Sequence, residues 1–148
     1  YKKFRIEIYK MDFAEEIKKL KEFNLPKEDF VVVGSGAMAI RGIRNSKDVD
    51  VLVVPKLWDE LSKEHKAYKN ESDVSSIKLD ENIEALNYEE SIYGNSEVVP
   101  FADVIKFADE IDGVKYINLD HLKKVKAWFG REKDLKDIEL IDEYLSRK

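Results

Sequence analysis

Residues 31–54 read VVVGSGAMAIRGIRNSKDVDVLVV and decide the fold of this chain. The β-branched run at residues 30–33 predicts a buried strand that ends in the turn Gly34-Ser35-Gly36. Residues 37–40 have room for only one or two helical turns, and the apolar run at residues 49–54 predicts a second strand. The stretch therefore predicts a strand, a glycine turn, a short helix and a strand.

The glycine turn has the composition of a phosphate-binding loop. Gly34 and Gly36 have no Cβ, so the backbone can approach a ligand there, and Ser35 adds a hydroxyl donor. Backbone N–H groups and the positive end of the following helix dipole would favour an anion. A plain tight turn explains the glycines equally well. A dinucleotide-binding fold does not fit, because Asp48 and Asp50 open the second strand instead of ending it, and the helix is too short for a parallel crossover.

Two aspartates mark the start of the second strand. Asp48 and Asp50 are two residues apart, so on a strand their side chains share one face, about 6.5–7 Å apart. Carboxylates placed in this way can bind Mg²⁺, or share two metal ions around a phosphoryl group. A third carboxylate would complete such a site, and the best candidate is Glu84 in the predicted strand 83–87. The alternative is that these acids only line the solvent-exposed face of their strands.

The remainder of the chain alternates between helical and strand patterns. We expect a helix over 13–23 that Asp12 caps, and a second helix from 57 to 68. A strand pair at 74–79 and 83–87, a helix or strand at 102–110 and a short strand at 115–117 should follow. The last expected element is a long helical stretch to 145, which Asn118 or Asp120 caps and Gly130 interrupts. Residues 1–10 fit either an edge strand or a flexible leader. We expect one domain over 1–148 with a mixed α/β (α+β) fold, in which helices flank a mixed sheet and a helix stands at the C-terminal end.

The composition limits the classes of function. The 148 residues include 26 Lys and Arg against 31 Asp and Glu, and the resulting formal net charge of −5 disfavours a general nucleic-acid binder. The absence of cysteine excludes disulfides, thiol nucleophiles and zinc–thiolate sites, and two distant histidines make a His-rich metal site a poor fit. No apolar run approaches the roughly 18 residues of a membrane span, and no signal-peptide pattern opens the chain. We therefore expect a cytoplasmic protein without membrane association.

The glycine turn and the paired aspartates together resemble a known family. Val33-Gly34-Ser35, then twelve residues, then Asp48-Val49-Asp50-Val51 is similar to the motif of the nucleotidyltransferase superfamily, which includes DNA polymerase β and antibiotic nucleotidyltransferases. Arg44 and Ser46, which precede Asp48, resemble the Arg-x-Thr/Ser-x-Asp segment of the small bacterial members. The fold that this resemblance implies is a minimal nucleotidyltransferase domain.

The C-terminal region carries a second similarity. Residues 126–138 read KAWFGREKDLKDI and resemble the Lys, then Arg-x-Lys/Arg-Asp-x-x-Asp segment of small nucleotidyltransferases, including lincosamide-type and toxin-type members. Lys126, Arg131 and Lys133 have the charge to neutralise a triphosphate, and the two aspartates would fix these cations or start the last helix. Each cation alone also fits a charged helix surface stabilised by i,i+3 and i,i+4 pairs.

Together, the two similarities imply an enzyme that transfers an NMP group from an NTP directly to a hydroxyl or phosphate acceptor with two Mg²⁺ ions. The implied roles are nucleotide binding by Gly34, Ser35, Arg44, Ser46, Lys126, Arg131 and Lys133, and catalysis with metal binding by Asp48, Asp50 and Glu84. The acceptor, whether RNA, protein or a small molecule, stays open, as does a partner protein or a homodimer mate that would help to select it. The alternative is a non-catalytic binding protein of the same fold, such as a toxin–antitoxin component.

Overall fold

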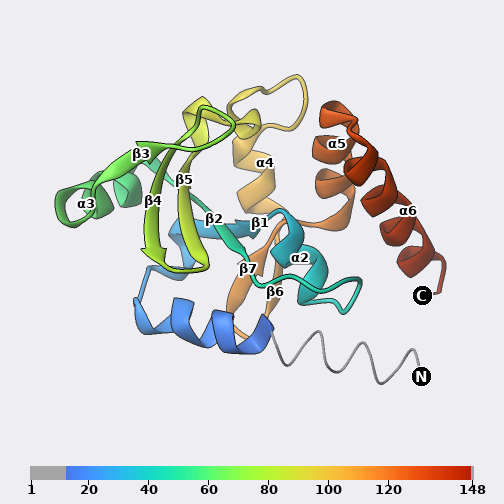
Figure 1. Cartoon of the computed structure of the whole chain (residues 1–148), viewed down its shortest axis with the longest axis horizontal. Coiled ribbons are helices and arrows are strands. Elements are labelled where there is room, and N and C mark those ends of the chain that lie inside the picture. Colours follow the sequence, from blue (N-terminus) through green and yellow to red (C-terminus); the bar gives the residue numbers. More distant parts are fainter. Residues whose placement is uncertain (1–12, 148) are drawn as a thin grey trace.

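One mixed sheet of seven strands organises the part of the chain that the structure, a computed structural model, describes: residues 13–147 (Figure 1). The strands are β1 (Phe30–Val33), β2 (Val49–Val53), β3 (Ala67–Lys69), β4 (Ser75–Asp80), β5 (Ile83–Asn87), β6 (Asp109–Ile111) and β7 (Val114–Tyr116). Their order across the sheet is β3-β4-β5-β2-β1-β7-β6. β1 runs antiparallel to β2, whereas β2 runs parallel to β5 and β1 parallel to β7, so the sheet is mixed as predicted.

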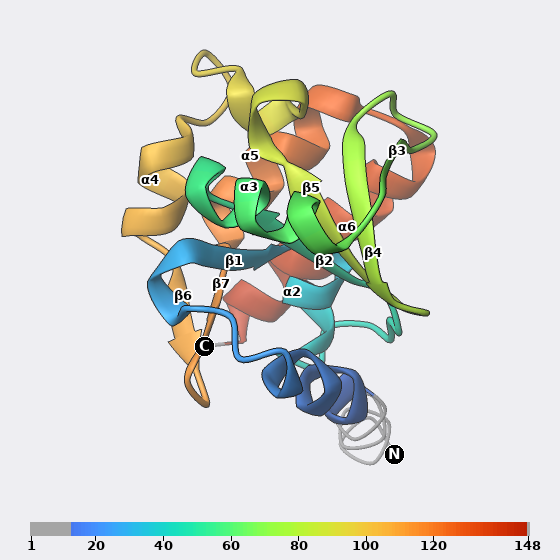
Figure 2. The same ribbon diagram turned by 90° about the vertical axis from the view of Figure 1, so that its left-hand side faces the viewer.

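Helices flank this sheet and confirm the mixed α/β class. They are α2 (Ser35–Ala39), α3 (Pro55–Glu64), α4 (Phe101–Lys106), α5 (Leu119–Phe129), α6 (Glu132–Ser146) and helical residues 13–22, with 3₁₀ turns η1 (Lys27–Asp29), η2 (Tyr88–Glu90) and η3 (Ile92–Gly94). α5 and α6 lie side by side at one end of the molecule, and α3 lies at the opposite end (Figures 1 and 2). Within residues 13–147, none of these helices has the length and apolar character needed to cross a membrane.

The connection between β1 and β2 carries the glycine turn. The two strands pair antiparallel, with Phe30 opposite Val53 and Val33 opposite Asp50. α2 between them has only five residues, too few to return the chain for a parallel strand. The prediction that no parallel crossover joins these strands is therefore confirmed.

The strands that carry the motif lie in the middle of the core. Val31, Val32 and Val51 are completely buried, and successive strand residues point to opposite faces, so β1 and β2 are covered on both sides. Phe13 and Leu20, from helical residues 13–22, are buried in the same core. A register slip of β1 or β2 would move the buried side chains of these strands out of the core. The packing therefore fixes where the polar ends of β1 and β2 lie.

Local capping residues set the limits of the C-terminal helices. Asn118, and not Asp120, caps α5, since Asn118 Oδ1 accepts a hydrogen bond from the His121 N–H at 2.7 Å. Gly130 ends α5 with a φ of +62°, a conformation that favours glycine. Asp134 Oδ2 then accepts the backbone N–H of Arg131 at 3.2 Å at the start of α6. The predicted interruption at Gly130 is confirmed.

Two predicted elements differ from the structure. The helix expected to reach residue 68 ends at Glu64, and residues 67–69 form β3 instead. Leu61 is the last buried apolar side chain of α3, so no further packing favours the helix, and His65 is extended. The region 102–110 is a helix followed by a strand, α4 and then the start of β6. The expectations for residues 1–10 and for the Asp12 cap lie outside the described residues.

Candidate functional site

Gly34 brings the backbone close to Asp50. Its φ of +69° and ψ of −151° lie where L side chains are strained, and a Cβ on it would stand 3.4 Å from Asp50 Oδ2. Gly36 has a different role from the one expected, because a Cβ on it would stand 3.0 Å from the ring of buried Phe13. The close approach at Gly36 is therefore to the core, whereas Gly34 lies beside an acid.

Asp50 and Glu84 are neighbours on adjacent strands. Asp50 on β2 pairs in register with Glu84 on the parallel strand β5, so both side chains leave the sheet on one face. Burial raises the pKa of Asp50 to about 7, and the negative charges of Glu84 and Asp48 add to the rise. Asp48 is exposed and immediately precedes β2. Within residues 13–147, none of the three acids forms an ion pair.

One cavity of about 740 Å³ brings most of the predicted site residues together. The predicted residues that line it are Gly34, Ser35, Asp48, Asp50, Glu84, Lys126, Arg131 and Lys133. Arg44 and Ser46 do not line it. The described part of the chain contains no group of three or more His, Asp or Glu side chains placed to hold one metal ion. The three carboxylates nevertheless line the same cavity.

Tyr68 is a neighbour of Glu84 that the sequence did not indicate. Its hydroxyl donates a hydrogen bond to Glu84 Oε1 at 2.7 Å, and this bond, followed by burial, raises the pKa of Tyr68 to about 12. No local pattern reveals the contact, because it depends on the pairing of β3 with β4, which in turn pairs with β5. A second tyrosine, Tyr93, is buried in the cavity wall, where burial and the charge of Asp50 raise its pKa.

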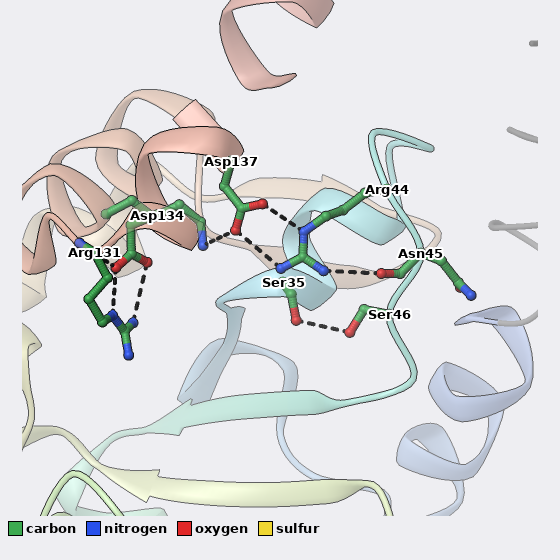
Figure 3. Close-up of polar contacts among 8 residues, drawn as sticks. Ser35, Arg44, Asn45, Ser46, Arg131, Asp134 and Asp137 are labelled. Carbon is green, nitrogen blue, oxygen red and sulfur yellow. Dashed lines mark hydrogen bonds and ion pairs between the residues drawn. The ribbon is translucent and has the colours of Figure 1, made fainter. Parts of the chain in front are cut away.

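Arg44 and Lys126 share one buried carboxylate, that of Asp137 (Figure 3). Arg44 Nε lies 2.8 Å from Asp137 Oδ1 and Arg44 Nη2 lies 3.1 Å from Oδ2, while Lys126 Nζ lies 2.8 Å from Oδ2. Burial pushes the pKa of Asp137 upwards, but the hydrogen bonds from Arg44 and Lys126 outweigh it and hold this pKa below its ordinary value. The loop before β2 is thereby tied to α5 and α6.

Arg131 is also paired with an acid, whereas Lys133 is not. Arg131 Nε donates to buried Asp134 Oδ2 at 2.6 Å, and the guanidinium lies 4.8 Å from the centroid of the Phe129 ring (Figure 3). Lys133 is exposed, lines the cavity and forms no ion pair with residues 13–147. Of the three predicted C-terminal cations, Lys133 is therefore the one left available to a ligand.

Ser46 supports the glycine turn from outside the cavity. The hydroxyls of Ser35 and Ser46 lie 2.9 Å apart (Figure 3), and Ser46 Oγ accepts the backbone N–H of Asp48 at 3.2 Å. One serine thus connects the turn after β1 with the chain that enters β2. Ser46 and Arg44 thus hold the loop in place through contacts within the chain.

Comparisons of the chain with protein-family models, with curated proteins and with solved structures give no match. Function is therefore inferred from the sequence motif and the geometry of the cavity. The acidic wall of the cavity, formed by Asp48, Asp50 and Glu84, suits a cation. The glycine turn and the basic wall, formed by Lys126, Arg131 and Lys133, suit an anion. A ligand that carries both, such as a metal-bound phosphate compound, fits this arrangement.

Proposed function

We propose that this protein is an Mg²⁺-dependent nucleotidyltransferase that moves an NMP group from an NTP to a hydroxyl or phosphate acceptor. The observation that carries the proposal is the close approach of the Gly34 backbone to Asp50, which itself pairs with Glu84 across β2 and β5. A turn suited to phosphate therefore lies beside two carboxylates suited to a divalent cation.

Asp50 and Glu84 have the chemistry of a Mg²⁺ site. Both offer carboxylate oxygens, the ligands that Mg²⁺ prefers. Burial and then the charges of Glu84 and Asp48 raise the pKa of Asp50, and a bound cation would offset this unfavourable environment for its charged form. Mg²⁺ held by Asp48, Asp50 and Glu84, with two ions in the proposed reaction, would offset charge on the transferred phosphate and activate the acceptor hydroxyl. Glu84 would also accept the proton that the acceptor loses.

The turn and the basic wall would hold the nucleotide. Gly34 and Ser35 would bind the leaving phosphates through the backbone and the serine hydroxyl, and Lys133 would add positive charge from the facing helix. Lys126 is already hydrogen-bonded to Asp137, so it would mainly stabilise the arrangement of α5 and α6 along the basic wall. The cavity volume of about 740 Å³ falls within the range usual for small-molecule sites, roughly 300–1,000 Å³.

The test is the Asp50→Asn variant, with transfer from the four NTPs labelled at the α-phosphate measured in the presence of Mg²⁺. We expect transfer to fall by about 10²-fold or more, because the variant removes a charge required at the reacting phosphate. Asp59→Asn is the matched control, since Asp59 is exposed on α3 and does not line the cavity, and it should keep full activity.

Two outcomes would contradict the proposal. Full NTP turnover by Asp50→Asn would remove the acid from the mechanism. A wild-type protein that NTP and Mg²⁺ stabilise against heat, but that transfers nothing to RNA, protein or small molecules, would instead be the non-catalytic binding protein of the same fold. Thermal denaturation with and without each ligand separates binding from transfer.

A further inference from the structure

Tyr68 is held at the cavity by its hydroxyl and not by packing of its ring. The residue is 43% exposed, and all three residues of β3 are exposed. β3 is an edge strand that pairs with β4 alone. The hydroxyl nevertheless reaches Glu84 Oε1 at 2.7 Å, so a polar contact and not the hydrophobic core determines where this side chain lies.

The carboxylate that Tyr68 contacts is the one beside Asp50. A general base must lie within about 2.6–3.2 Å of the group whose proton it removes, and the Tyr68–Glu84 distance of 2.7 Å meets this requirement. Tyr68 lines the same cavity as Gly34 and Asp50. Glu84 Oε2 is left for other partners, because Tyr68 bonds Oε1. A hydroxyl of the chain itself thus occupies the position that an acceptor hydroxyl would take against its base.

We propose that Tyr68 is a site of self-modification, the acceptor to which the chain transfers an NMP group in cis. This inference rests on the proposed nucleotidyltransferase function. The phenolic oxygen of Tyr68 forms a bond to the α-phosphorus of the NTP, and the bond from that phosphorus to the oxygen that bridges to the β-phosphate breaks. Pyrophosphate leaves, and the phenolic proton passes to Glu84. The product is a tyrosine–nucleoside phosphodiester on β3.

Two kinetic properties follow from an acceptor that belongs to the chain. The modification stops at one NMP group per chain, because the hydroxyl is consumed. Its rate constant does not depend on protein concentration, because the hydroxyl and its base already lie in contact within one molecule. An acceptor on a second molecule would make the rate rise with protein concentration.

The experiment uses the full chain with Mg²⁺ and NTP labelled at the α-phosphate, and follows protein-bound label and pyrophosphate release together. Cleavage after glutamate releases residues 65–71, in which Tyr68 is the one tyrosine, for mass spectrometry. We expect this peptide to gain the mass of one NMP group, and Tyr68→Phe to reduce bound label to the level of Asp50→Asn. Tyr88→Phe is the matched control, since the Tyr88 ring stacks on Phe101, 3.9 Å between centroids, and does not line the cavity, and it should label as the wild type does.

The outcomes separate this inference from the proposed function. Pyrophosphate release by the wild type without label in peptide 65–71 would overturn the role of Tyr68 and leave the nucleotidyltransferase proposal intact. A labelling rate that rises with protein concentration would overturn modification in cis. No pyrophosphate and no label with any of the four NTPs would overturn the role of Tyr68, and the nucleotidyltransferase proposal would fall with it only if transfer to added RNA, protein and small-molecule acceptors were also absent. Tyr68→Phe is expected to fold, because the exposed side chain loses only its hydroxyl, and thermal denaturation checks this.

Discussion

The acidic and basic walls of the cavity differ in whether their charged side chains form ion pairs within the chain. On the sheet, Asp50 and Glu84 lie side by side and form no ion pair within residues 13–147, and the pKa of Asp50 rises to about 7. On the helices, Lys126 and Arg131 line the cavity, and each is bound by a buried carboxylate: Lys126 by Asp137, which also binds Arg44 from the loop before β2, and Arg131 by Asp134. The acidic wall therefore carries uncompensated charge, whereas most of the basic wall is neutralised from within.

This difference indicates which charges serve a ligand and which serve the fold. A buried charge without a partner is costly, so its presence in a cavity favours a functional role. A buried charge with full hydrogen bonding is already accounted for by the structure. By this criterion the proposed function assigns Asp50 and Glu84, which are half-buried and form no ion pair within residues 13–147, to a ligand, whereas Arg44 and Lys126 connect the loop before β2 to the C-terminal helices.

The largest expected effect is on stability and comes from Asp137→Ala. Removal of this carboxylate leaves the Lys126 ammonium buried without its partner, so the free energy of unfolding should fall by about 3–5 kcal/mol, measured by urea denaturation. Asp142→Ala is the matched control, because Asp142 on α6 also pairs with α5, through Lys123, but is more than half exposed. We expect that control to lose less than about 1 kcal/mol. Equal losses in the two variants would show that Asp137 is an ordinary surface pair.

A smaller effect of opposite sign is expected for Asp50→Asn in metal-free buffer. The pKa of Asp50 is about 7 in the folded protein against 3.8 for the ordinary group, so between about pH 4 and 7 the folded state keeps a proton that the unfolded state releases. Wild-type stability should fall as pH rises through this window, and the variant should lack this fall. Since one pKa unit corresponds to about 1.4 kcal/mol and water partly reaches the side chain, we expect the variant to be more stable by about 2 kcal/mol at pH 8.

Urea denaturation of both proteins at pH 4 and pH 8 measures this difference. The advantage of the variant should nearly vanish at pH 4, where Asp50 is protonated in the folded protein and the acid and the amide are both neutral. Asp59→Asn should change stability little at either pH, because the Asp59 side chain is exposed. An Asp50→Asn protein that is less stable than the wild type at pH 8 would mean that the acidic wall is compensated after all.

The strands around the motif could be predicted because their signals are local. The β-branched run 30–33, the glycine turn and the run 49–54 each contain the residues that determine their structure. β3 could not be predicted, because its three residues are exposed and form a strand only by pairing with β4. For the same reason the contact between Tyr68 and Glu84 has no signal in the sequence.

The candidate site also contains features that have a local signal in the sequence and features that depend on tertiary packing. Asp48 and Asp50 could be named from their spacing, and Glu84 from its place on a predicted strand. The availability of the cations could not be predicted, because the partner of Arg44 lies 93 residues away along the chain. The sequence gives the sign of each charge, but only tertiary packing determines whether a carboxylate of the same chain has already bound it.

The smallest expected effect concerns Lys133, which alone of the three predicted C-terminal cations forms no ion pair within residues 13–147. Lys133→Gln should weaken binding of an NTP in the presence of Mg²⁺ by about 5-fold, the equivalent of about 1 kcal/mol for an exposed charge, measured by calorimetry. Lys136→Gln is the matched control on the same helix, since Lys136 is exposed, does not line the cavity and pairs with Glu132. If both variants weaken binding equally, the helix attracts nucleotide through its overall charge. If Lys133→Gln alone does so, the basic wall keeps one cation for the ligand while its carboxylates hold the rest.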